Sequence, residues 1–286
     1  MNPSAKTYRQ WTDWGTASLR EAGIEEPRRT SSRLLMLATG LSSLDTIRRE
    51  HQLILDETVV TAFKSFIQRR MTHEPLQHIE GETWFYGRSF KTDHRALIPR
   101  DDSEILVDEV LKRLPLDGPR HVADLGTGTG CLLLTVLLER PQLIGTGVEL
   151  SEEAAALATE NVDLHQLADR VTLANGGWQA WTGWADADLI LSNPPYIDKA
   201  TLSTLAPEVR DFDPVVALDG GVDGLTCYRD IIKRAAANMK VGAWLCFEIG
   251  YDQGETVPGL LRTAGFSDIS VHQDLSSHDR VVCARK

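Results

Sequence analysis

The last two thirds of the chain alternate short apolar runs with segments in which apolar residues recur every three or four positions. The apolar runs are residues 121–125, 143–148, 171–174, 187–191 and 243–249. Runs of this length predict buried strands, and the periodic segments between them predict amphipathic helices. Strand and helix in alternation are typical of an α/β fold with a doubly wound, mostly parallel sheet, whose ligands bind at the C-terminal ends of the strands.

Two further strands are predicted near the C-terminus, at residues 267–273 and 280–284. The link between them is too short for a parallel crossover, so we expect them to pair antiparallel and to complete a seven-stranded sheet. The helices that we expect around this sheet cover residues 103–114, 130–139, 152–165, 225–239 and 256–264.

The N-terminal part has apolar residues at helical spacing, and Asp56 is a suitable N-cap for the last helix predicted there. Between residues 75 and 99 the pattern changes to aromatic and β-branched residues around Gly87, which predicts a β-hairpin. We therefore expect a small helical domain at residues 1–74, a β-hairpin linker at 75–100 and an α/β domain at 101–286.

The chain is acidic, with 41 Asp and Glu against 30 Lys and Arg and a formal net charge of −11. Nucleic-acid binding depends on cations that neutralise phosphates, so we expect no direct contact with DNA or RNA. Hydrophobic residues make up 42% of the sequence and charged residues 25%, which excludes a wholly disordered or fibrous chain.

No segment has the length or composition of a membrane span. The longest apolar run, residues 131–138, is far shorter than the roughly 20 residues that cross a bilayer. The polar N-terminus lacks the apolar stretch of a secretory signal, so we expect a cytoplasmic protein. The four cysteines and eight histidines show no metal-ligand spacing, and we expect no metal site.

A glycine-rich loop follows the first predicted strand, with Gly126, Gly128 and Gly130 at alternate positions. Glycines at such a turn let the backbone approach a ligand and let the next helix begin close to the sheet, although packing alone also selects them. The dinucleotide pattern G-x-G-x-x-G is not met, because its third position is Cys131, and no P-loop lysine follows. The loop therefore favours a nucleoside-type ligand without phosphates.

Glu149 ends the second predicted strand, 19 residues beyond Gly130. A carboxylate at this place can accept hydrogen bonds from both hydroxyls of a ribose. Together, the loop and the acid look like a binding site for S-adenosylmethionine (AdoMet), but they do not identify the methyl acceptor.

Asn193, Pro194, Pro195 and Tyr196 follow the strand predicted at 187–191, at the end that lies beside the glycine loop. The two prolines restrict the backbone, and the Asn193 side-chain carbonyl can accept a hydrogen bond from a planar NH₂ group. Tyr196 offers an aromatic face for stacking or for packing against a sulfonium cation. Such a site suits methyl transfer to an amide or amino nitrogen that is conjugated to a π system.

With these motifs the chain resembles the AdoMet-dependent release-factor glutamine methyltransferases, the PrmC/HemK family. The similarity extends from about residue 74 to the C-terminus, with a compatible helical segment before it. The matching stretches, of sequence EPLQ, LIPR, VRDFDP, GGVDGL and EIG, are residues 74–77, 97–100, 209–214, 220–225 and 248–250.

The resemblance implies a class I methyltransferase fold in which residues 101–286 form the catalytic domain. It implies transfer of a methyl group from AdoMet to the side-chain nitrogen N5 of the glutamine in the Gly-Gly-Gln motif of peptide-chain release factors, in support of translation termination. It assigns catalysis to Asn193, Pro194 and Tyr196, substrate binding to these residues and Pro195, and AdoMet binding to Asp124, Gly126, Thr127, Gly128, Thr129, Gly130, Glu149, Trp178 and Asn193.

Two positions depart from the family pattern, and one assignment has a simpler explanation. Gly177 stands where the family often has an acid, and Asp213 where it usually has Glu. Trp178 is followed by Trp181 and Trp184 at helical spacing, so all three could be core residues.

Two other methyl acceptors stay open. One is the N6 amino group of adenine in DNA or RNA, which would need base flipping and phosphate contacts. The acidic charge and the lack of a target-recognition domain weigh against it. The other is a glutamine of a ribosomal protein, although the stretch IPRDDSE at residues 98–104 fits the release-factor group better.

Overall fold

The computed structural model describes residues 6–54, 56–115, 117 and 120–286. The chain divides into two compact units, Met1–Gly81 and Glu82–Lys286. Within the described residues, no helix is long and apolar enough to cross a membrane, and no group of three or more His, Cys, Asp or Glu side chains is placed to hold a metal ion. Each unit has its own apolar core and is described by itself.

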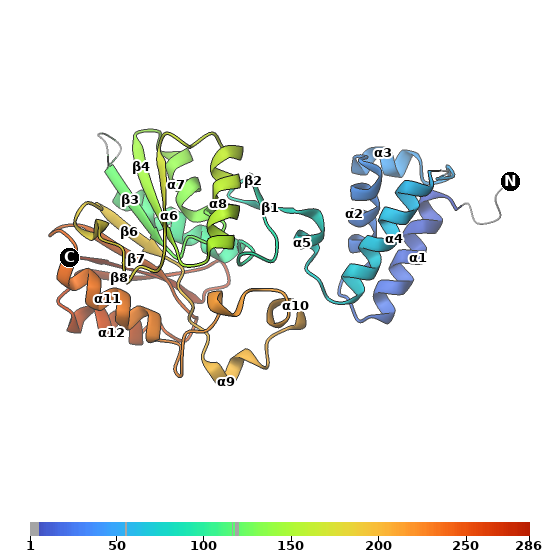
Figure 1. The fold of residues 1–286 in the computed structure, drawn as a ribbon. Helices are drawn as coiled ribbons and strands as arrows, with labels where there is room; N and C mark the ends of the chain where they lie inside the picture. The colour runs from blue at the N-terminus through green and yellow to red at the C-terminus, as the bar shows by residue number, and fades with distance from the viewer. Residues whose placement is uncertain (1–5, 55, 116, 118–119) are drawn as a thin grey trace. The chain divides into compact units, whose positions relative to one another are not determined.

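The first unit is helical, as predicted. Its helices are α1 (Tyr8–Glu21), α2 (Pro27–Thr39), α3 (Ser43–Arg48), α4 (Glu57–Met71) and α5 (Leu76–Glu80) (Figure 1).

The ends of these helices follow from local side-chain chemistry. Asp56 caps α4 as predicted, because its carboxylate accepts a hydrogen bond from the Thr58 N–H at 2.8 Å. Helix α5 was not predicted. Five residues are too few to show a helical period, and the helix ends at Gly81 with a φ of 77°, a left-handed conformation that favours glycine.

The second unit contains the predicted seven-stranded sheet, in the order β5-β4-β3-β6-β7-β9-β8. Strands β3 to β7 pair parallel, and β8 and β9 pair antiparallel, as expected from the short link between them. Strand β9 also pairs antiparallel with β7, which was not predicted. The strands are β3 (Arg120–Leu125), β4 (Leu143–Glu149), β5 (Val171–Asn175), β6 (Leu189–Ser192), β7 (Trp244–Glu248), β8 (Ser267–Gln273) and β9 (Asp279–Arg285).

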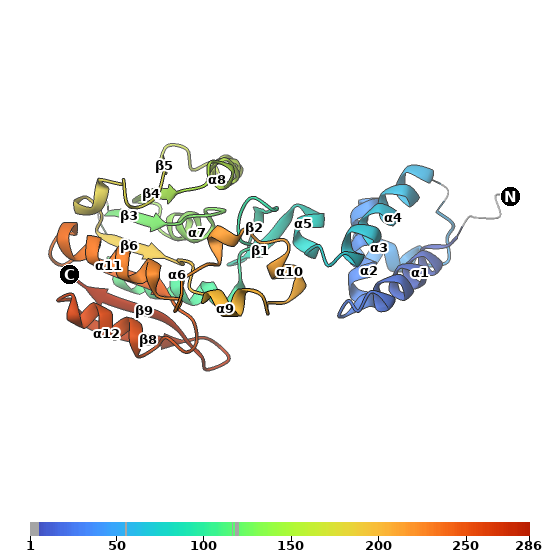
Figure 2. The same cartoon turned by 60° about the horizontal axis from the view of Figure 1, so that its bottom comes forward.

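Successive residues of the central strands enter two different cores, one on each face of the sheet. In β6, Leu189 and Leu191 belong to one core and Ile190 to the other. The first core also contains residues of α6 (Glu104–Arg113), α7 (Cys131–Glu139) and α8 (Glu152–Leu164). The second contains residues of α11 (Thr226–Asn238) and α12 (Thr256–Thr263), which lie side by side in Figures 1 and 2. Both faces are therefore covered by helices, which explains why these strands are apolar without alternation.

The predicted hairpin is formed by β1 (Glu82–Phe85) and β2 (Arg88–Lys91), which pair antiparallel across Tyr86 and Gly87. Phe85 and Phe90 are buried in the core that contains α6 to α8. The Lys91 N–H also donates to the Asn161 side chain of α8 at 2.7 Å. The hairpin therefore packs as part of the second unit.

Short helical turns complete the second unit. They are η1 (Asp101–Ser103), η2 (Gly183–Ala185), α9 (Lys199–Leu202), α10 (Pro207–Arg210) and η3 (Val215–Ala217). Along the chain, η1 comes directly before α6, and α9, α10 and η3 lie between β6 and α11. These turns matter below because η1 and η3 contribute residues to the cavity of the second unit.

Candidate active site

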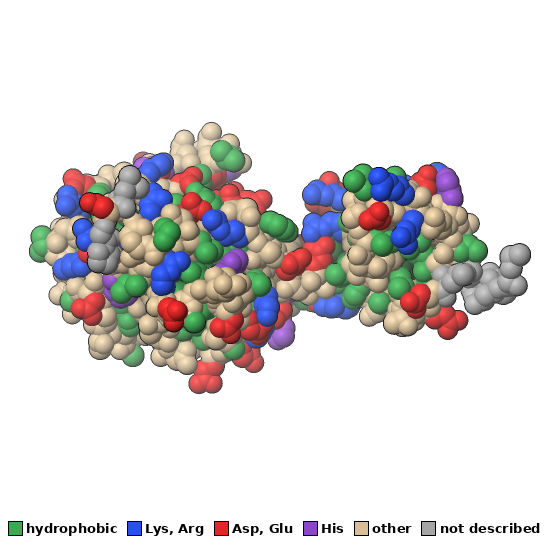
Figure 3. All heavy atoms as spheres, turned by 90° about the horizontal axis from the view of Figure 1, so that it is seen from above, with side chains coloured by type: hydrophobic (Ala, Val, Ile, Leu, Met, Phe, Trp, Pro, Cys, Tyr) green, Lys and Arg blue, Asp and Glu red, His purple; other side chains and the backbone are tan. Residues whose placement is uncertain are grey.

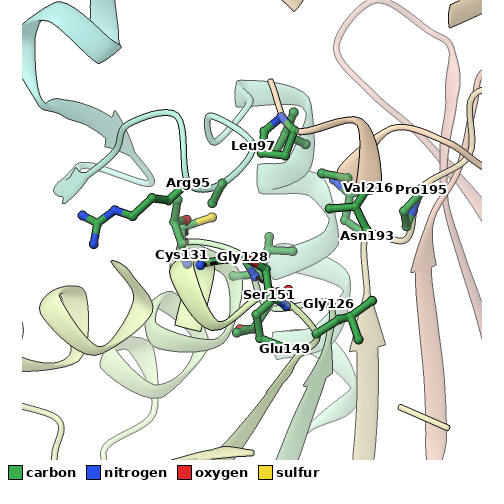
Figure 4. A pocket seen from close by; sticks show the side chains of 18 of the residues that line it. Arg95, Leu97, Gly126, Gly128, Cys131, Glu149, Ser151, Asn193, Pro195 and Val216 are labelled. Atoms are coloured by element: carbon green, nitrogen blue, oxygen red, sulfur yellow. Dashed lines mark hydrogen bonds between the residues drawn. The ribbon is translucent and has the colours of Figure 1, made fainter. Parts of the chain in front are cut away.

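A cavity of about 960 Å³, open space at its mouth included, lies at the C-terminal ends of β3, β4 and β6. Figure 4 shows Gly126, Gly128, Glu149 and Ser151 on one side of it, and Asn193 with its neighbours on another. The cavity therefore brings together the two motifs that sequence analysis singled out.

The glycine-rich loop turns sharply from β3 into α7. Gly126, Gly128 and Gly130 have φ angles of 75°, 55° and 82°, which side chains with a Cβ rarely adopt. The loop is held to the neighbouring strand, because the Gly126 N–H donates to the Val148 carbonyl oxygen at 2.8 Å. The glycines are thus required by the backbone, and Gly126, Thr127, Gly128 and Thr129 all line the cavity.

Asp124 lies beneath this loop and not among the residues that line the cavity. Its carboxylate accepts a hydrogen bond from the Thr127 hydroxyl at 2.7 Å. Burial raises the pKa of Asp124 to about 7, and the nearby Glu149 carboxylate adds to the increase. In this position Asp124 fixes the loop from below, while its predicted contact with the ligand stays a prediction.

Glu149 lines the cavity at the end of β4. One carboxylate oxygen accepts from the Gly128 N–H at 2.8 Å and the other from the Ser151 N–H at 2.9 Å. An ionised carboxylate offers about four acceptor positions. Two positions therefore remain for a ligand, which matches the two hydroxyls of a ribose.

Trp178 packs, like Trp181, against the core that contains Trp184. It lines the cavity, and its indole N–H donates to Asp230 at 2.9 Å. Trp184 is 4% exposed and packs against Trp181, with ring centroids 5.3 Å apart. A Cβ at Gly126 would lie 3.8 Å from the edge of the Trp178 ring, so the ring lies beside the first glycine of the loop.

The four residues of the NPPY segment, 193–196, do not all line the cavity. Asn193 and Pro195 line the cavity, and Pro194 is buried. The Tyr196 side chain does not line it, because its hydroxyl points toward Glu248 and donates to that carboxylate at 3.4 Å. Burial raises the pKa of Tyr196 above its usual value. The predicted contacts of Pro194 and Tyr196 with the methyl acceptor stay predictions.

The chain segment at 218–224 supports the NPPY backbone, a role that sequence analysis missed. The Ile197 N–H donates to Leu218, and the Gly220 N–H donates back to the Ile197 carbonyl at 2.8 Å. A Cβ at Gly220 would lie 2.8 Å from the Tyr196 backbone. The glycines of this segment lie in a stretch that resembles the family, but the sequence did not show that they approach the backbone of the NPPY segment.

Asp213, one of the two departures from the family pattern, forms an ion pair with Arg100 at 2.9 Å. Arg100 lines the cavity, whereas the Asp213 side chain is fully buried. Burial raises the pKa of Asp213, although Arg100 opposes this increase. The shorter Asp side chain therefore still reaches Arg100.

Comparison with known proteins assigns both units to one family. Residues 10–81 match the PrmC N-terminal domain, and residues 101–208 match the methyltransferase small domain. The release factor glutamine methyltransferase of Geobacter sulfurreducens is 39% identical, over 99% of this chain and 98% of that protein. The chain belongs to the release factor glutamine methyltransferase family.

Other members of the family agree. The release factor glutamine methyltransferase of Caulobacter vibrioides is 38% identical over 94% of this chain and 92% of its own length, and that of Cereibacter sphaeroides is 40% identical over 93% and 94%. A methyltransferase from Pyrococcus furiosus, with a TM-score of 0.52, 14% identity and coverage of 70% of this chain and 90% of that one, shares the fold. The second unit thus has the fold of AdoMet-dependent methyltransferases.

The residues around the cavity fit AdoMet. The Glu149 carboxylate has acceptor positions left for ribose hydroxyls, and Trp178 offers an aromatic face for a planar base. Gly177 has no side chain to contact the base, but a Cβ there would meet the flexible end of Gln179 and not backbone. A side chain at this position would therefore have to displace the end of Gln179.

Proposed function

We propose that this enzyme transfers the methyl group of AdoMet to the side-chain amide nitrogen, N5, of the glutamine in the Gly-Gly-Gln motif of peptide-chain release factors. The observation that carries this proposal is that Asn193 and the glycine loop with Glu149 line the same cavity. The names of the relatives support the choice of acceptor. AdoMet, when bound, supplies a methyl group on a positively charged sulfur.

The chain's own residues orient the acceptor amide. In this proposal the Asn193 side-chain carbonyl and the Pro194 backbone carbonyl accept the two N–H groups of the glutamine amide. A primary amide is a weak nucleophile because its lone pair is delocalised into the carbonyl. Fixing the NH₂ group in line with the methyl favours transfer by orientation, and the two carbonyl dipoles stabilise the positive charge that the nitrogen gains. The methyl group leaves the donor sulfur as the C–N bond forms, and the nitrogen then releases one proton to solvent, leaving a neutral methylated amide.

The surface charge of the second unit supports a protein acceptor over a nucleic acid. Residues 82–286 contain 31 Asp and Glu against 19 Lys and Arg. Figure 3 shows Lys and Arg interspersed with Asp and Glu on the face drawn. Phosphate recognition requires a local excess of cations. We therefore propose that the enzyme has no direct nucleic-acid partner. We also propose that it has no membrane partner and no metal, and that it acts in the cytoplasm, where translation ends.

We also propose a division of labour along the chain. Residues 101–286 perform catalysis, residues 1–74 contribute to docking of the release factor, and residues 75–100 link the two. The match of residues 10–81 to a domain model of this family supports a family-specific role for the helical part.

The test compares three classes of acceptor under one set of conditions. The enzyme is incubated with AdoMet carrying a radioactive methyl group and with a purified release factor, duplex and single-stranded DNA, or ribosomal protein. We expect rapid labelling of the release factor alone. Faster labelling of DNA or of ribosomal protein would overturn the proposed acceptor.

A further inference from the structure

Glu248 is a buried carboxylate at the C-terminal end of β7, with a relative exposure of 2%. One of its oxygens accepts a hydrogen bond from the Ser103 hydroxyl at 2.5 Å, and the other accepts from the Tyr196 hydroxyl at 3.4 Å. Ser103 is 145 residues away in sequence and Tyr196 is 52 residues away. A single carboxylate therefore joins three chain segments.

Two of these segments build the cavity. Ser103 itself lines it, at the point where η1 passes into α6. Tyr196 follows Asn193 after two prolines, whose restricted backbone transmits the position of the tyrosine to the asparagine. Glu248 thus holds the hydroxyl of Ser103, which lines the cavity, and the hydroxyl of Tyr196, the last residue of the NPPY segment.

We propose that Glu248 is a positioning residue for methyl transfer, which fixes Asn193 relative to the cavity through Tyr196 and Ser103. This inference rests on the proposed function, because it assigns Glu248 a role in that reaction. Glu248 itself does not line the cavity. Its effect is geometric, since displacement of a reacting group by about 1 Å costs on the order of 100-fold in rate.

The environment of Glu248 makes this arrangement sensitive to pH. Burial raises the pKa of Glu248 to about 7, and Asp102 adds to the increase, while the Ser103 hydrogen bond, Arg280 and the Tyr196 hydroxyl oppose it. Tyr228, on α11, donates to the Glu248 backbone carbonyl at 2.8 Å, and Cys131, on α7, also lies within electrostatic reach.

The ionised and neutral forms of Glu248 hold the two hydroxyls differently. An ionised carboxylate accepts from both, whereas a protonated one carries a hydrogen on one oxygen and loses an acceptor there. The ionised form is therefore the active one, and kcat should rise as the pH increases through about 7.

The first experiment measures kcat for the wild type and for Glu248→Gln between pH 6 and 8, with a release factor as acceptor. Glutamine has nearly the same shape and resembles the neutral acid. We expect kcat at pH 8 to fall about ten- to a hundredfold, with AdoMet affinity nearly unchanged and with the rise in kcat near pH 7 abolished.

Glu109→Gln is the matched control. Glu109 is also a buried carboxylate of the second unit, at 4% exposure, but its partners are Lys112, Arg113 and His272 and it does not line the cavity. We expect it to keep the wild-type pH profile. A kcat that Glu248→Gln lowers by the same factor at every pH, or an equal effect of Glu109→Gln, would show a structural role and overturn the proposal.

The second experiment needs no methyl acceptor. In protein labelled with ¹³C-tyrosine, the Tyr196 signal is assigned with Tyr196→Phe and followed by NMR from pH 6 to 8. We expect a shift with a midpoint near pH 7 in the wild type that is lost in Glu248→Gln. If Glu248→Gln does not fold, Ser103→Ala, which removes one of the two donors, should move this midpoint upward.

The two experiments separate the two proposals. A Tyr196 signal that does not respond to pH overturns the role of Glu248, whatever the acceptor is. A pH-dependent Tyr196 signal in an enzyme that does not methylate release factors supports the contact and overturns the proposed function.

Discussion

Replacement of Glu149 with Ala tests the AdoMet site most quantitatively. The change removes two acceptors that hold the backbone N–H groups of Gly128 and Ser151 at 2.8 and 2.9 Å, together with the acceptor positions proposed for the ribose. Hydrogen bonds to charged groups contribute about 1.5–3 kcal/mol each in favourable cases, and Glu149 is partly exposed. We therefore expect a total loss of about 2–4 kcal/mol in binding, or a roughly 30- to 1,000-fold higher Kd for AdoMet.

Isothermal titration calorimetry at constant pH and salt measures this change directly. Glu153→Ala is the matched control, because it removes an exposed acid from the first turn of α8, one turn further along the chain. Glu149→Gln should lie between Ala and the wild type, since its amide keeps one acceptor oxygen. An AdoMet affinity of Glu149→Ala within about twofold of the control would refute the assignment, provided that both variants unfold at similar temperatures.

Replacing Asn193 with Ala removes a side chain of the cavity wall and leaves the glycine loop intact, so we expect AdoMet affinity within about threefold of the wild type and methyl transfer lowered at least ~100-fold. Retained turnover in a radiometric assay would contradict this. Gly220→Ala places a Cβ 2.8 Å from the Tyr196 backbone and should lower kcat. Its control is Gly259→Ala, whose Cβ meets nothing within 4 Å and which should keep the wild-type kcat. Equal kcat values for the two variants would show that the segment at 218–224 does not support the NPPY backbone. Burial raises the pKa of Asp124 from 3.8 in the unfolded chain to about 7 in the folded protein. Between about pH 4 and 7 the folded protein therefore binds one more proton at this site than the unfolded chain, and the free energy of unfolding should decrease as the pH rises through this range. In urea unfolding, the free energy of unfolding of Asp124→Asn should depend less on pH over this range than that of the wild type. The same pH dependence in both proteins would contradict the contribution of Asp124.

The parallel pairing of the central strands was predictable because burial on both faces makes them apolar throughout and helices alternate with them, whereas the order of the strands in the sheet was not predicted. Leu189, Ile190 and Leu191 form such a run, and each is 0% exposed. The antiparallel end of the sheet followed from chain length alone, since the link between β8 and β9 cannot support a crossover. Helix α5 could not be predicted, because one turn and a half shows no period.

The candidate site was predictable only as far as backbone position determines it. Parallel topology places the ends of β3, β4 and β6 at one edge of the sheet, and this brings Gly126, Glu149 and Asn193 to one cavity. The sequence around the two prolines does not show in which direction the following side chain points. The contact of Tyr196 with Glu248 was therefore not predicted. Contacts such as Ser103 with Glu248 join residues far apart in sequence, and neither residue type suggests the other.

The most direct test of the central claim is to locate the methyl group. A release factor incubated with the enzyme and with AdoMet that carries a deuterated methyl is digested and sequenced by tandem mass spectrometry, alongside a release factor whose Gly-Gly-Gln glutamine is replaced by Ala. We predict one methyl group on the side-chain nitrogen of that glutamine and none on the Ala variant. A label on another residue, or equal labelling of both release factors, would contradict it.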